Sequence, residues 1–171
     1  MRPCWGVDPL PAASEMNARV AHVARTVDLF VGCTKLDAAP FVEISPRASR
    51  LRALGPFAKV GARVASEAMT RRVFSGPAER LADRWRSNGG RASVYRLDWS
   101  PPGAPLGACH CMDLPLLLGT PDAWAGAPML GPHPDPVDQR LARKMRRLWS
   151  RFAYDGVRAL DAERLRLDVA H

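Results

Sequence analysis

The stretch Gly107–Gly119, G-A-C-H-C-M-D-L-P-L-L-L-G, carries a single histidine, His110, in a loop of small residues. Just upstream, Ser93–Trp99 alternates large apolar and polar side chains, a pattern that predicts a β-strand. Turn-forming residues fill Ser100–Gly107 between them. The sequence therefore places His110 on a loop that leaves the end of a strand, where α/β enzymes carry catalytic groups.

A second predicted strand comes earlier in the chain. Val27–Gly32 (V-D-L-F-V-G) is a short apolar run typical of a buried strand. The loop Cys33–Asp37 follows it, and Ala38–Val42 has the pattern of a helix start. Both strands thus lead into a loop that carries a titratable side chain.

Helical patterns fill the segment between the two strands. We expect one helix over Ile44–Gly55, one over Phe57–Phe74, and a third that Ser75 caps and Asn88–Gly90 ends. Helices in this position form the crossover that joins two parallel strands. The predicted fold class is therefore α/β, rich in helix, with about two parallel strands.

Two more helices are predicted outside this unit. Ser14–Thr26 begins with Ser14 as N-cap, and Pro136–Tyr154 has the clearest helical pattern in the chain. The apolar residues of the second fall on one stripe, namely Val137, Leu141, Met145, Leu148, Trp149 and Phe152. This stripe needs a sheet or other helices to cover it.

The histidine loop resembles a known family. Its pattern D-W, Pro-rich loop, G-A-x-H-x-x-[acid]-L-P-x-x-x-G is similar to the C-terminal part of type-B carboxylesterases, the para-nitrobenzyl esterase and cholinesterase-like α/β-hydrolases. The resemblance implies that His110 is a catalytic base. Asp113 stands where the family usually has Glu.

The loop after the first strand resembles the same family. Strand, then G-x-T-x-x-[acid]-A and an apolar helix start, is the setting of the family's triad acid, which is commonly Glu. The resemblance implies that Asp37 takes this role. Acid and base also occur in the order that α/β-hydrolases use. The likeness extends over residues 27–156, which is the C-terminal third of a full family member.

The nucleophile that this chemistry needs has no counterpart in the sequence. No G-x-S-x-G elbow and no H-G-G-G-like oxyanion segment occur. Ser66 and Ser75 lie on or beside predicted helices, and Cys109 and Cys111 point away from His110 along an extended chain. We therefore expect the chain to be inactive alone, as a carboxylesterase remnant or as one half of a split enzyme.

The expected organisation and partners follow from this. We predict an N-terminal extension over residues 1–26 that contains the helix Ser14–Thr26, an α/β-hydrolase-like segment over 27–156 and a tail over 157–171. An N-terminal hydrolase half that carries the serine, or a second copy of the chain, would cover the strand edge and apolar surface left open. A small ester is the expected substrate of the completed site. The alternative is a small, basic, non-catalytic interaction protein.

The net charge bears on one further class of partner, nucleic acid. The net charge is +8 and the pI is near 10.2 over 171 residues, and the positive charge is almost all arginine. Basic proteins attract nucleic acid, but no compact basic module is visible. We therefore interpret the arginines as solvated helix faces and do not expect nucleic acid as a partner.

The remaining histidines and cysteines add no second site. His22 lies on a predicted helix surface, and His133 is flanked by prolines in a predicted loop. Cys4, Cys33, Cys109 and Cys111 form no C-x-x-C pair, so neither a metal ion nor another cofactor is implied. With no signal-peptide pattern and no long apolar run, we expect a cytoplasmic protein with reduced thiols.

Overall fold

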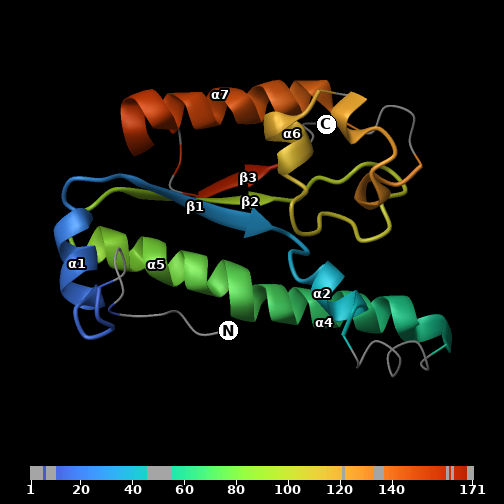
Figure 1. Cartoon of the computed structure of the whole chain (residues 1–171), viewed down its shortest axis with the longest axis horizontal. Helices are drawn as coiled ribbons and strands as arrows, with labels where there is room; N and C mark the ends of the chain where they lie inside the picture. The colour runs from blue at the N-terminus through green and yellow to red at the C-terminus, as the bar shows by residue number, and fades with distance from the viewer. Residues whose placement is uncertain are drawn as a thin grey trace.

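The protein forms a small parallel sheet with helices on both faces. The computed structural model describes residues 6, 11–45, 55–120, 122–132, 137–160, 162 and 164–168. Strands β1 (Leu29–Thr34), β2 (Ala92–Leu97) and β3 (Arg164–Leu167) pair in the order β1-β2-β3, and both pairs are parallel. Helix α7 (Gln139–Asp155) covers one face, whereas α4 (Ala58–Thr70) and α5 (Gly76–Ser87) lie on the other side (Figure 1).

The predicted α/β class is confirmed, with one strand more than expected. The sequence predicted about two parallel strands, but β3 pairs with β2 as a third. This strand lies in the segment expected to be a tail, and its four residues give too short a pattern to recognise. It leaves β2 in the centre, so β1 is an edge strand within the part of the chain that the structure describes.

The first strand begins two residues later than predicted. The N–H of Val27 donates to the carbonyl of Val23, which keeps Val27 in the turn after helix α1 (Met16–Val23). Asp28 is also held outside the strand, because it forms an ion pair with Arg91 and its carboxylate accepts the N–H of Val157. β1 then runs from Leu29 to Thr34 and pairs residue by residue with β2.

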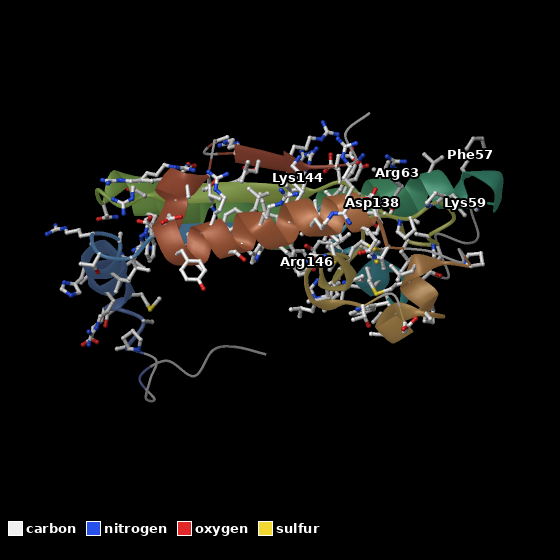
Figure 2. The ribbon with its side chains drawn as sticks, turned by 90° about the horizontal axis from the view of Figure 1, so that it is seen from above. Phe57, Lys59, Arg63, Asp138, Lys144 and Arg146 are labelled. Atoms are coloured by element: carbon white, nitrogen blue, oxygen red, sulfur yellow. The ribbon has the colours of Figure 1, made fainter. Side chains whose placement is uncertain are left out.

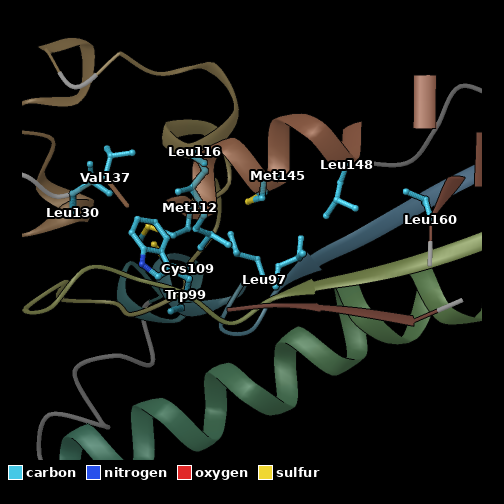
Figure 3. Close-up of a cluster of buried hydrophobic side chains, with 14 residues drawn as sticks. Leu97, Trp99, Cys109, Met112, Leu116, Leu130, Val137, Met145, Leu148 and Leu160 are labelled. Carbon is cyan, nitrogen blue, oxygen red and sulfur yellow. The ribbon is translucent and has the colours of Figure 1, made fainter. Parts of the chain in front are cut away.

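The face of the sheet toward α7 holds the main core. Phe30 and Tyr95 contact Trp149 with ring centroids 4.8 and 4.9 Å apart. Gly32 is required here because a Cβ on it would lie 2.2 Å from the carbonyl oxygen of Tyr95. The predicted α7 stripe is thus covered by the chain's own sheet. Figure 3 shows the core residues Leu97, Trp99, Cys109, Met112, Leu116, Leu130, Val137, Met145, Leu148 and Leu160.

The opposite face holds a smaller apolar cluster. Ala82 and Trp85 of α5 pack against Leu29, Val31 and Val94, which alternate with the residues facing α7. The indole Nε1–H of Trp85 donates to the carbonyl of Val27 at 2.8 Å. Helix α1 packs against the same cluster through Val20 and Val23.

Helices α4 and α5 form one continuous rod through a π-helical turn, η2 (Arg71–Ser75). The prediction that Ser75 starts a new helix as a side-chain cap is wrong, since its hydroxyl forms no cap hydrogen bond. Buried Thr70 and Ala78 are eight residues apart, about one more than two α-helical turns span. The π-turn absorbs the extra residue and keeps one buried face along the rod.

Helix α7 has the clearest start and end. The Asp138 carboxylate accepts the N–H of Leu141 at 2.7 Å, and Gly156 with φ 70° ends the helix. Asp138 therefore caps the helix, and the predicted start at Pro136 lies ahead of it in a part that the structure does not describe (Figure 2). No helix in the described ranges is both long and apolar enough to cross a bilayer.

The shorter elements lie in the connections. They are α2 (Ala39–Glu43), η1 (Gly55–Phe57), α6 (Leu114–Leu118), η3 (Asp122–Trp124), η4 (Pro128–Leu130) and η5 (Gly156–Ala159). Of the helix predicted over Ile44–Gly55, residues 46–54 lie outside the described residues, and Ile44 and Ser45 follow α2 as a turn. The predicted Ser14 cap is wrong, because α1 starts after Glu15 with no side-chain cap.

Candidate acid and base site

Asp37 is held in a tight loop at the carboxyl end of β1. Its carboxylate is buried, and Oδ2 accepts the N–H of Thr34 at 2.9 Å. The next residue, Ala38, donates its N–H to the hydroxyl of Thr70 on α4, also at 2.9 Å. The loop is therefore fixed from both sides, and the carboxylate has one defined direction.

His110 is placed by a loop that is tied to the Asp37 loop. The N–H of Leu36 donates to the carbonyl of Ala108 at 2.8 Å, and Leu36 forms a parallel bridge with Cys109. Cys111 follows with φ 66°, a left-handed conformation that is uncommon for a residue other than glycine. These contacts bring the ends of β1 and β2 together, as predicted for adjacent parallel strands.

The two predicted site residues meet. His110 Nδ1 lies 2.5 Å from Asp37 Oδ1. The Asp37 side chain is 7% exposed and the His110 side chain 45% exposed, so a buried carboxylate contacts an imidazole that reaches the surface. The predicted geometry is confirmed: the pair lies at one end of two adjacent parallel strands. Because Asp37 engages Nδ1, Nε2 is the ring nitrogen left to exchange a proton with another group.

Two phenylalanines that the sequence analysis did not assign to the site flank the imidazole. Phe41 of α2 and Phe74 of the π-turn lie 5.4 and 5.7 Å from the His110 ring, centroid to centroid, and stack on each other at 6.1 Å. Phe41 comes four residues after Asp37, whereas Phe74 comes from a segment that is distant in sequence. No local pattern assigns Phe74 to the site, because its position depends on the π-helical turn that joins two helices.

The cysteines near the site are poor nucleophiles. Burial, with the Asp37 charge adding to it, raises the pKa of the Cys33 thiol to about 11. Burial also raises the pKa of Cys109 and of Cys111. All three thiols therefore stay largely protonated at neutral pH, whereas the thiolate is the reactive form. This agrees with the expectation that neither Cys109 nor Cys111 attacks a substrate.

Asp113 has a different contact from His110. Its Oδ2 accepts the hydroxyl of Tyr95 at 3.5 Å. Burial first, and then the charge of Asp113, raises the pKa of Tyr95. Asp113 therefore helps to seat the histidine loop on the sheet.

The other predicted candidates lie away from the site or outside the description. His22 is exposed on α1, as expected, and His133 and Cys4 lie outside the described residues. Ser66 is within α4 and donates to the carbonyl of Ala62, so it sits on no strand-to-helix elbow. Among the described residues, no group of three or more His, Cys, Asp or Glu side chains is arranged to hold a metal ion.

Comparison with known proteins finds a similarity to a hydrolase. The chain is 35% identical over 156 residues to a probable N-octanoylanthranilate hydrolase, AqdA2, of Rhodococcus erythropolis. The aligned region is 90% of this chain and 34% of the relative, so the chain spans about one third of the length of the curated relative it matches. No family model matches the chain. The similarity supports a relationship to hydrolases.

Proposed function

We propose that this chain carries the acid and the base of a serine-hydrolase triad of the type-B carboxylesterase kind. The observation that carries the proposal is the contact between His110 Nδ1 and Asp37 Oδ1. The similarity of the chain to a named hydrolase supports it independently. The reaction would be hydrolysis of a carboxylic ester or a related acyl bond.

The geometry suits a defined division of roles. Asp37, held by the Thr34 amide, accepts the Nδ1–H of His110 and so leaves Nε2 unprotonated. Nε2 takes the proton of a serine hydroxyl as its oxygen attacks the acyl carbon. The imidazolium then gives that proton to the leaving group as the bond to it breaks.

The serine and the oxyanion donors would come from other polypeptide. The sequence has no G-x-S-x-G elbow. β1 has an open edge within the described chain, and α4 directs apolar side chains to solvent, including Val60 and Val64, which are 62% and 59% exposed. We infer that an N-terminal hydrolase segment, as a separate chain or as preceding sequence, covers this side and completes the site.

A chimera tests this directly. The aligned third of the Rhodococcus hydrolase would be replaced by this chain and assayed on the substrate that its name states. We expect activity that falls about a thousandfold or more in His110→Ala and in Asp37→Asn, because either change removes a working triad. His22→Ala, on the exposed face of α1, is the matched histidine control and should keep full activity.

The isolated chain gives the complementary result. It should hydrolyse aryl esters no faster than a histidine-containing control peptide, since no activated nucleophile is present.

A chimera that folds but is inactive beside an active parent would contradict the proposal. Burst kinetics from the isolated chain, blocked by a serine-directed phosphonate, would contradict the missing nucleophile. A folded but inactive chimera would favour the alternative function, that of a small non-catalytic interaction protein.

A further inference from the structure

A recess lies at the carboxyl ends of the strands, and neither His110 nor Asp37 lines it. Its volume is about 240 Å³. Its lining includes Thr34 at the end of β1, Lys35 directly after it and Arg96 of β2. Arg71 and Ser75, the first and last residues of the π-turn, also line it. Ligands of parallel α/β sheets bind at this end of the strands, and π-turns are frequent at functional sites.

The charges around the recess do not balance. Arg96 is engaged by two hydrogen bonds of 2.6 and 2.9 Å to the buried carboxylate of Asp98, which also pairs with Arg166. Glu67, the acidic residue of the lining, pairs with Arg63 at 3.1 Å. Lys35 and Arg71 have no carboxylate partner within the described residues. Two positive charges therefore remain for a ligand.

Hydroxyl groups complete the lining. Thr70 accepts the N–H of Ala38, and its own proton has no acceptor among the described residues, so it can be donated to a ligand. The Thr34 hydroxyl is buried and has no hydrogen-bond partner in the described part of the chain. A buried hydroxyl without a partner is uncommon and costly, and a turn about χ1 toward a bound acceptor would relieve that cost.

We propose that this recess binds a small oxyanion, either a phosphate or a short carboxylate. Lys35 and Arg71 supply charge, and Arg71 also offers the planar fork that fits either group. The volume is below that of typical drug-sized sites, which favours a ligand of a few heavy atoms. Thr34 and Thr70 also hold the Asp37 loop, so an anion here would stiffen that loop.

Thermal unfolding of the full chain tests the site. Sodium phosphate and sodium acetate are titrated separately against sodium chloride at fixed ionic strength, which distinguishes the two ligand classes from general salt effects. We expect at least one oxyanion to raise Tm saturably above the chloride control. The Lys35→Gln/Arg71→Gln variant should bind at least tenfold more weakly.

The matched control loses the same two charges elsewhere. Arg140→Gln/Lys144→Gln changes one arginine and one lysine that are exposed on α7 and do not line the recess. Helix α7 lies on the face of the sheet opposite α4 (Figure 1), so this variant should respond like the unmodified chain. Equal loss in both double variants, or no response to either oxyanion, would overturn the proposal. If the pocket variant unfolds, amide NMR shifts of the unmodified chain decide: they must concentrate at residues 34–35 and 70–75.

Discussion

Helices α4 and α7 lie on opposite sides of the same sheet. The apolar side chains of α7 point toward the sheet, whereas valines of α4 point away from it. In α7 the apolar stripe faces inward, so that Leu141, Met145 and Leu148 are buried. In α4 the buried residues are Ser66 and Thr70, whereas Val60 and Val64 point to solvent. Phe57, just before α4, is 73% exposed on that outer surface (Figure 2).

The difference shows on which side of the molecule the chain covers its own apolar surface. Apolar burial is the main source of stability, and α7 supplies it from within the described chain. Helix α4 is held by polar contacts instead, such as the hydrogen bond between Thr70 and Ala38. An apolar face turned outward is typical of a surface that another polypeptide covers. The α4 side is thus where the proposed hydrolase partner fits.

The largest expected contrast is in stability. Met145→Ala removes a fully buried side chain from the α7 core and should lower the free energy of unfolding by about 2–5 kcal/mol. Val64→Ala, on the outer face of α4, should change it by no more than about 0.5 kcal/mol. Urea denaturation of the isolated chain measures both. A large cost at Val64 would mean that the isolated chain already covers this face, for example by self-association.

Thiol reactivity gives a second, smaller contrast. Cys33 lies on the α4 side and Cys109 in the α7 core, and both are buried. If the α4 side opens more easily, alkylation at neutral pH should modify Cys33 at least about tenfold faster than Cys109, a difference of roughly 1.4 kcal/mol in opening.

Peptide-resolved mass spectrometry would follow the two sites, with guanidinium-unfolded chain as the control in which both react alike. Because Cys33 is buried and burial also raises the pKa of its thiol to about 11, we expect the reaction to proceed through opening of the structure rather than through a native thiolate. Equal rates would contradict the difference between the two sides.

The sequence predicted those parts of the fold that local patterns encode. The α7 stripe and the α5 terminus at Asn88–Gly90 depend on periodicity and helix-stop residues, and both are confirmed. The boundary of β1 was wrong because Asp28 and Val27 are held by distant or helical partners. The break at Ser75 was wrong because Ser-Gly-Pro is a strong helix-start signal that the π-turn overrides.

The candidate site was predictable where motif and topology coincide. His110 and Asp37 each follow a strand, and parallel pairing of adjacent strands brings their ends together. The surroundings of the pair were not predictable. Thr70 and Phe74 reach it from a helical segment more than thirty residues away in sequence, and no local signal assigns either of them to the site. The catalytic roles of His110 and Asp37 remain predictions that the chimera tests.

The smallest expected effect concerns the two helix starts. Asp138 caps α7 through the amide of Leu141, so Asp138→Ala should cost about 0.5–2 kcal/mol. Ser75 precedes α5 but makes no cap hydrogen bond, because the π-turn continues through it, and Ser75→Ala should change stability by no more than about 0.5 kcal/mol. Urea denaturation of both variants compares a true helix start with an apparent one. If Ser75→Ala costs as much as Asp138→Ala, α5 begins as a separate helix in solution, and the continuous rod on the α4 side is wrong.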